Sequence, residues 1–192
     1  MSETDMDPVP LPQPRVVYGQ TALRPTREED CDFVLAAESH PDNAGFVEQW
    51  SRARHRQAIR SSDSLHWIVE SRGEPIGYAV LEDADDPNHS LLLRRIVIVS
   101  KGRGHGRAAV VLLARYCFDV LHFHRLWLFV AVENRRATAL YRKLGFVTEG
   151  VARECVRHGD RYSSMHIMSI LEPEYRNGPG RQSRRNPVPP HA

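Results

Sequence analysis

The stretch from Lys101 to Arg107, which reads K-G-R-G-H-G-R, constrains the fold of this chain more than any other part of its sequence. An apolar run, Leu91–Val99, precedes it, and a helix-forming run, Ala108–Val120, follows it. The order predicts a strand, a tight glycine loop and a helix. Such a loop turns backbone N–H groups toward one point at a helix start, where the dipole also favours an anion. Taken alone, the pattern fits a pyrophosphate cradle and an ordinary strand-to-helix turn equally well.

Composition places the chain among ordinary globular proteins. Its 192 residues are 41% hydrophobic and 26% charged, and a formal net charge of +2 gives no general reason to expect nucleic-acid binding. The cysteines Cys31, Cys117 and Cys155 are widely spaced and form no C-x-x-C pair, so we predict neither a metal site nor a disulfide framework. No signal-peptide pattern and no apolar run of roughly 18 residues occur, which predicts a cytoplasmic protein with no membrane partner.

Composition also divides the chain into three regions. Residues 1–17 are acidic and rich in proline, and residues 173–192 combine Pro, Gly and Asn with a small basic cluster. Both compositions are typical of flexible tails, so residues 18–172 are predicted to form one folded domain. A module that binds nucleotides or nucleic acid through the basic tail is an alternative, and a solvated tail is the plainer interpretation.

The first half of the predicted domain alternates short strands with two helices. Thr26 followed by Glu29 forms a capping-box pattern, which predicts a helix that runs to about Glu38. Apolar residues at helical spacing predict a second helix over about Ala44–Arg60. The predicted strands of this half are Gln20–Arg24, His66–Glu70 and Pro75–Glu82.

The second half contains a strand–helix–strand unit and a closing hairpin. The apolar strand Leu91–Val99 is interrupted by Arg94 and Arg95, which mark a bulge or a functional cleft. A helical crossover leads to the strand Arg125–Val132, so these two strands are expected to be parallel. A helix capped by Asn134 follows. The predicted strands of the closing hairpin are Val147–Arg157 and Arg161–Leu171.

Two motifs at a matching separation resemble those of the GNAT N-acetyltransferases. K-G-R-G-H-G-R is similar to the family's Q/R-x-x-G-x-G/A loop, with Lys101 at its first position. E-N-R-R-A-T-A-L-Y-R-K-L-G-F, Glu133–Phe146, is similar to the family's N-x-x-A-x-x-L-Y-x-K-x-G-F. The resemblance implies an α/β fold with a mixed, mostly antiparallel sheet of six to seven strands, a central splayed parallel pair and about four helices. Within the family, the chain resembles the branch of ribosomal-protein N-terminal and polyamine acetyltransferases.

The resemblance implies acetyl-CoA as the acyl donor, with no metal. The pantetheine arm would enter the gap of the splayed pair and contact strand backbone near Ile96, Val97 and Ile98. The pyrophosphate would be held by the loop amides of Arg103, Gly104, His105, Gly106 and Arg107. Asn134 matches the family asparagine that contacts the CoA arm, and it also suits a helix N-cap. Tyr141 matches the family tyrosine beside the CoA sulfur, where a phenol donates a proton to the departing thiolate; without that match, a core tyrosine is the plainer interpretation.

The implied reaction is direct attack of a primary amine on the thioester. Some relatives carry a glutamate base on the strand before the glycine loop, but Leu91–Val99 contains no carboxylate. We favour Glu82, at the end of the neighbouring strand, as the catalytic base. The alternatives are a water relay, Glu38, Glu70, His89 and His166.

The acceptor remains a choice among a protein N-terminus, a polyamine and another small amine. An acidic pocket would suit a basic acceptor, and it could be supplied by Glu38, Asp42, Glu82 and the acids of Asp83–Asp86. The competing hypotheses are transfer of another acyl group, transfer to a hydroxyl, and a CoA-binding domain without catalysis that acts as a sensor or interaction module. Homodimers are common in the family, which makes a homodimer one assembly to test.

Overall fold

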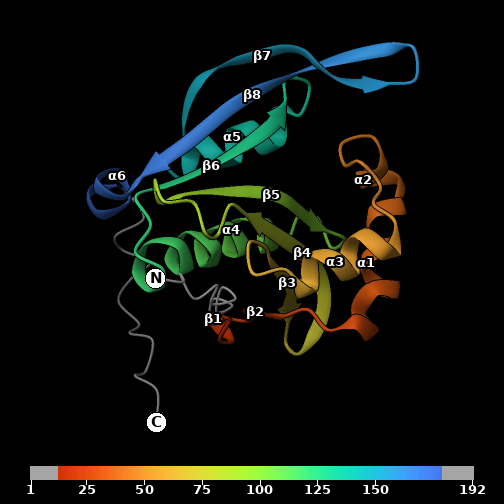
Figure 1. Cartoon of the computed structure of the whole chain (residues 1–192), viewed down its shortest axis with the longest axis horizontal. Helices are drawn as coiled ribbons and strands as arrows, with labels where there is room; N and C mark the ends of the chain where they lie inside the picture. The colour runs from red at the N-terminus through yellow and green to blue at the C-terminus, as the bar shows by residue number, and fades with distance from the viewer. Residues whose placement is uncertain (1–12, 179–192) are drawn as a thin grey trace, which may run out of the picture.

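The computed structural model describes residues 13–178, and one eight-stranded mixed sheet organises them (Figure 1). The strand order is β1-β2-β3-β4-β5-β6-β8-β7, and within the described residues only β5 and β6 pair in parallel. The strands are β1 Val16–Tyr18, β2 Thr21–Pro25, β3 Leu65–Ser71, β4 Glu74–Glu82, β5 Ser90–Ile98, β6 Arg125–Ala131, β7 Val147–His158 and β8 Arg161–Leu171. The expected α/β fold is confirmed, with one strand more than the six to seven predicted.

Six α-helices flank the sheet in residues 13–178, where about four were predicted. They are α1 Cys31–Ser39, α2 Pro41–Ala44, α3 Arg52–Arg60, α4 His105–Arg115, α5 Arg135–Lys143 and α6 Glu172–Asn177. A 3₁₀ turn at Glu28–Asp30 precedes α1, and a π-helical turn at Tyr116–Val120 follows α4. β1 and α6 extend the ordered elements past the predicted limits of 18 and 172. The remaining parts of the two predicted tails, 1–12 and 179–192, lie outside the described residues.

Two apolar layers lie on opposite faces of the sheet. On one face, α4 packs over β1, β2 and β5, with Leu112 fully buried. On the other face, α1 and α3 pack over β3, β4 and β5, with Val34 fully buried. Successive side chains of a strand point to opposite faces, so each strand contributes to both layers. In β4, Ala79 packs in the α4 layer, while Tyr78 and Val80 pack in the α1–α3 layer.

The parallel pair is short and then parts. Pairing joins Ser90–Leu93 to Arg125–Leu128. Beyond these residues, β5 continues to pair with β4 and β6 with β8, and the described register contains no further β5–β6 pairs. The backbone groups along the two facing edges are therefore left for another partner. The predicted splayed parallel pair is confirmed.

A β-bulge lies in β5 where the pair parts. Val80 of β4 pairs with Arg95, but the next residue, Leu81, pairs with Leu93, so Arg94 is the extra residue. The bulge interpretation of the two adjacent arginines is thereby confirmed.

The second long helix predicted in the first half is wrong, because residues 45–51 form neither helix nor strand between α2 and α3. Tertiary contacts hold this segment instead. The backbone N–H of Trp50 donates to the carboxylate of Glu38 at 2.9 Å, and the Glu48 carbonyl accepts from the Arg95 guanidinium. These bonds replace the ones that a continuous helix would make.

The predicted capping box at Thr26 and Glu29 is also wrong, by one residue. The carboxylate of Asp30 accepts from the backbone N–H of Arg27 at 2.8 Å. The hydroxyl of Thr26 is unavailable to a cap because it lies 2.8 Å from Nδ1 of the buried His66. A long-range contact has again displaced a local one.

Candidate active site

The glycine loop joins β5 to α4, as the sequence predicts. Gly102 and Gly104 have φ angles of +85° and +79°, which residues with a side chain adopt only at a cost. A Cβ at either position would meet no atom within 4 Å, so the loop surface is open there. Gly104 is the N-cap of α4, which begins at His105 rather than at the predicted Ala108. The first N–H groups of α4 have no partner within the helix, which suits them to an anion.

Gly106 brings three elements of the site together. A Cβ there would lie 3.9 Å from Cγ1 of Ile98, at the end of β5, and 3.8 Å from Cδ2 of Leu140, in α5. Both are ordinary van der Waals distances, so the space around Gly106 would admit a Cβ. Its φ angle also lies outside the left-handed region, so the backbone does not require glycine here as it does at Gly104. The contact places the start of α4 beside the turn of α5 that carries Tyr141.

The basic residues of the loop differ in their surroundings. Arg103 and Arg107 are exposed, which leaves both guanidinium groups accessible to an anion. The ammonium group of Lys101 donates instead to the backbone carbonyl of Asp42 in α2. This bond ties the glycine loop to the helices on the other face of the sheet.

The predicted pantetheine strand has its side chains committed to the core. Val97 is buried in the α1–α3 layer, while Ile96 and Ile98 pack against the α4 layer. One edge of this stretch pairs with β4, and the other lies along the gap to β6. The strand therefore offers backbone rather than side chains, as the predicted role requires.

Two residues of the second motif lie on α5. The side-chain oxygen of Asn134 accepts from the backbone N–H of Ala137 at 3.1 Å, which confirms the N-cap interpretation. Tyr141 is only 6% exposed, and its ring centroid lies 5.5 Å from that of Phe146. Burial raises the pKa of the Tyr141 hydroxyl, so the phenol is protonated at neutral pH. A proton donor must have this property.

Glu82 is the last residue of β4 and pairs with Leu92, beside the place where β5 leaves β6. It follows Val80 at a two-residue spacing and so lies on the α1–α3 face of the sheet. Its carboxylate is partly exposed, and Oε2 lies 3.4 Å from Nε of the bulge residue Arg94. The sequence did not predict this ion pair.

The other base candidates lie on different elements of the structure. The carboxylate of Glu70 forms an ion pair with Arg24 at 2.7 Å. His89 lies against an aromatic ring in the loop before β5, and His166 is on β8. Glu38 is 1% exposed and lies in the last turn of α1.

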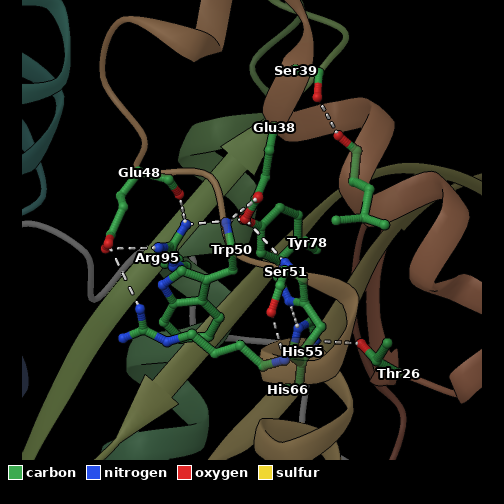
Figure 2. Close-up of polar contacts among 12 residues, drawn as sticks. Thr26, Glu38, Ser39, Glu48, Trp50, Ser51, His55, His66, Tyr78 and Arg95 are labelled. Atoms are coloured by element: carbon green, nitrogen blue, oxygen red, sulfur yellow. Dashed lines mark hydrogen bonds and ion pairs between the residues drawn. The ribbon is translucent and has the colours of Figure 1, made fainter.

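Sequence reasoning missed a buried polar cluster on the α1–α3 face (Figure 2). We call it the Glu38 cluster, and it consists of Thr26, Glu38, Trp50, His55, His66, Tyr78 and Arg95. These residues come from segments far apart in the chain and form no local motif. The one signal in the sequence was the charge of Arg95 inside an apolar strand.

Comparison with known proteins identifies the family. The model of the acetyltransferase (GNAT) family matches residues 24–146, which include both the glycine loop and the Asn134–Phe146 motif. The chain belongs to the GNAT acetyltransferase family. This membership makes it an acetyltransferase and confirms the resemblance seen in the sequence.

Several of the similar proteins are polyamine acetyltransferases. Spermidine N(1)-acetyltransferase of Escherichia coli K12 is 27% identical over 164 residues, which cover 80% of this chain and 87% of that protein. The Vibrio cholerae enzyme of the same name is 38% identical over 77 residues, or 40% of this chain and 44% of that one. A crystal structure of the Vibrio cholerae spermidine N-acetyltransferase with CoA and spermine has a TM-score of 0.75 and 26% identity, covering 82% of this chain and 99% of that chain. The polyamine acetyltransferase branch is the one these relatives support.

In residues 13–178, no cluster of His, Cys, Asp and Glu side chains is arranged to hold a metal ion. No helix in that part of the chain combines the length and apolar character needed to cross a bilayer.

Proposed function

We propose that this acetyltransferase transfers the acetyl group of acetyl-CoA to a primary amine of a polyamine such as spermidine. One observation supports acetyl-CoA as the acyl donor. β5 and β6 part after Leu93 and Leu128, and β5 then leads directly into the glycine loop and α4. Two open strand edges and a helix N-terminus thus lie along one path. The similarity to spermidine N(1)-acetyltransferases supports a polyamine as the acceptor.

The residues along this path fit acetyl-CoA. Its pantetheine arm carries amide groups, which match the open backbone edge of β5 at 96–98. Its pyrophosphate matches the open loop at Gly104, the first amides of α4, and the exposed guanidinium groups of Arg103 and Arg107. When bound, acetyl-CoA supplies the thioester carbonyl carbon that the amine attacks.

Tyr141 is the proposed general acid. Its neighbour Leu140 contacts the start of α4 at Gly106, so this turn of α5 lies beside the donor path. Burial keeps the phenol protonated at neutral pH. As the C–S bond breaks, negative charge develops on the sulfur, and the phenol O–H donates its proton to the leaving thiolate. Solvent then returns a proton to the phenolate.

Glu82 is the proposed general base that takes a proton from the acceptor ammonium, so that the neutral amine can attack the thioester. It is partly exposed, so an amine can reach it, and it lies where β5 leaves β6. The guanidinium of Arg94 holds the carboxylate in place at 3.4 Å. A carboxylate at this opening also complements the positive charge of a polyamine.

Release of free thiol from acetyl-CoA, measured over a panel of acceptors, tests the proposed function. The panel contains spermidine, spermine, a short peptide with a free N-terminus and a hydroxyl acceptor of similar size. We expect kcat/KM for the polyamines to exceed that for the peptide by at least about tenfold. Tight CoA binding without thiol release from any acceptor would support the non-catalytic alternative instead. Faster turnover of the peptide would overturn the polyamine assignment while leaving acetyl transfer intact.

Glu82→Gln tests the base separately. Removing a general base should lower kcat/KM about 100-fold while leaving CoA affinity unchanged. Glu74→Gln, at the exposed other end of β4, is the matched control and should leave both unchanged. An unaltered kcat/KM in Glu82→Gln would remove Glu82 from the mechanism.

A further inference from the structure

The Glu38 cluster fills the layer between α1, α3 and the strands β3–β5, and the proposed reaction uses none of it (Figure 2). Glu38 is 1% exposed, Arg95 is 7% exposed and His55 is fully buried. Burying ionised groups is costly unless each has partners that replace water. Here hydrogen bonds and ion pairs within the cluster supply those partners.

Arg95 connects the donor strand to the segment between α2 and α3. Its Nη1 donates to Oε1 of Glu38 at 3.0 Å and also to the backbone carbonyl of Glu48. The guanidinium carbon lies 3.9 Å from the centroid of the Trp50 ring, a cation–π distance. Glu38 completes the connection by accepting the backbone N–H of Trp50. Residues 48–50, which have no regular structure of their own, are thus attached to β5 through side chains.

The same arginine depends on the bulge in β5. Leu93 belongs to the α4 layer, so in a regular strand Arg95, two residues later, would point into that apolar layer as well. The extra residue Arg94 reverses the alternation and brings Arg95 onto the other face, beside Glu38. A register without the bulge would bury an unpaired charge among apolar side chains. The Arg95–Glu38 ion pair therefore favours the bulged register.

The rest of the cluster keeps Glu38 ionised. Burial alone would raise the pKa of Glu38, but contacts from His55 and Tyr78, the Trp50 amide and the Arg95 charge outweigh it, so the pKa lies below its usual value. The Tyr78 hydroxyl donates to Oε1, and Nε2 of His55 lies 3.2 Å from the same oxygen. Glu38 is thus a fixed negative charge that gives Arg95 a single favoured position.

We propose that Arg95, held by Glu38, is a positioning residue for acetyl transfer: it fixes the bulge that parts β5 from β6, and it holds residues 48–50 beside the resulting opening. Arg95 itself touches neither substrate. The proposal rests on the proposed function, because the opening matters only if acetyl-CoA and an acceptor meet there. This role accounts for a charged side chain at position 95, inside a run whose other residues are nearly all apolar.

The test uses the full chain and compares single and paired substitutions. Arg95→Met leaves the buried carboxylate unpaired and is expected to unfold more readily, so Glu38→Gln/Arg95→Met, which removes both charges at similar volume, is the informative variant. Arg24→Met is the matched control, because Arg24 also forms part-buried ion pairs, with Asp30 and Glu70, but lies on β2 away from the opening. Thermal unfolding, CoA affinity by calorimetry and steady-state kinetics with spermidine are measured for each.

We expect the double variant to fold, to bind CoA about tenfold more weakly and to show a KM for acetyl-CoA raised by a similar factor. Its kcat should stay within about threefold of the parent value, because Tyr141 is unaltered. Arg95→Lys, which keeps the charge opposite Glu38, should recover most of the CoA affinity. Arg24→Met should lose stability without any kinetic change.

A folded double variant or Arg95→Lys variant with parental CoA affinity, acetyl-CoA KM and spermidine KM overturns the positioning role. A kcat loss as large as that of a Tyr141 variant would also overturn it, because it would make Arg95 part of the chemistry. Failure of the proposed function looks different. The parent chain would then release no thiol with any amine, while the calorimetric comparison of CoA affinity would still report on the bulge.

Discussion

The proposed donor side and the Glu38 cluster of this acetyltransferase are built in opposite ways. The proposed donor side consists of two short stretches of sequence, 101–107 and 134–146, each with a glycine or asparagine cap at a helix start. The Glu38 cluster consists of side chains drawn from residues 26 to 95. The first is specified by turns and helix starts, and the second exists only once the sheet and the helices have packed.

This difference predicts different responses to substitution. Residues on the donor side act individually, so each substitution should change one property, either chemistry, affinity or helix stability. Four residues of the Glu38 cluster, Trp50, His55, Tyr78 and Arg95, contact the Glu38 carboxylate. Substitutions there should therefore be coupled and should change stability together with binding.

Tyr141→Phe should give the largest effect and should change chemistry alone. Removing a general acid is expected to lower kcat by about 100-fold or more. The phenyl ring keeps the contact with Phe146, so CoA affinity and the unfolding temperature should change little. Steady-state kinetics and calorimetry check the two halves. Unchanged kcat would remove Tyr141 from the mechanism and leave it a core residue.

The donor side was predictable from the sequence because its physics is local. Glycines at positive φ, a helix N-cap and a strand–loop–helix order leave direct marks in the residue pattern, and Gly104 and Asn134 behave as predicted. The parallel pair and its parting also followed, through the crossover rule and the family resemblance.

The Glu38 cluster was not predictable because its contacts replace local preferences. Thr26 has a capping-box pattern, yet its hydroxyl contacts His66 forty positions later. The segment 45–51 has helical periodicity, yet Trp50 gives its N–H to Glu38. Helical spacing cannot reveal a buried carboxylate whose partners lie on other elements. Only Arg95, a charge in an apolar strand, indicated that such a partner must exist.

His66→Gln should sharpen the contrast through pH. Burial, then the neighbouring His55, lowers the pKa of His66 to about 3, against 6.5 in the unfolded chain. Below pH 6.5 the unfolded chain therefore takes up a proton that the folded chain refuses, so stability present above pH 6.5 is lost as the pH falls toward 3. At pH 5, 1.5 units below 6.5, this loss is about 2 kcal/mol.

Urea unfolding of the parent and of His66→Gln at pH 7.5 and pH 5 measures this contribution, since groups far from His66 titrate alike in both proteins. The difference in free energy of unfolding between the two proteins should shift by about 2 kcal/mol between these pH values. The charged and titratable groups around His66 are His55, Glu38, Arg95 and Asp30. The exposed His124→Gln is the control, and an equal shift in it would mean that burial of His66 has no such effect.

Gly104→Val and Gly106→Ala should separate two kinds of glycine within the loop. Gly104 has φ of +79°, so a valine there strains the backbone at the start of α4 and should weaken CoA binding roughly tenfold. Gly106 has an ordinary φ, and an added Cβ would meet Leu140 and Ile98 at van der Waals distance, so alanine should leave the affinity within about twofold. Equal losses in calorimetry would show that the cradle depends on empty space rather than on conformation.

Asn134 offers the smallest effect and the closest test of whether one donor-side residue performs two tasks. Asn134→Ala removes the cap on the Ala137 N–H and should cost about 1 kcal/mol, or about 2–4 °C in unfolding temperature. Asn134→Ser keeps a capping oxygen and should restore that temperature. If Asn134 also contacts the CoA arm, serine should still bind CoA severalfold more weakly, because its side chain is shorter. Full recovery of both properties in the serine variant would leave Asn134 as a cap alone. Loss of affinity without loss of stability would show that even on the locally built side a single residue serves both the helix and the ligand.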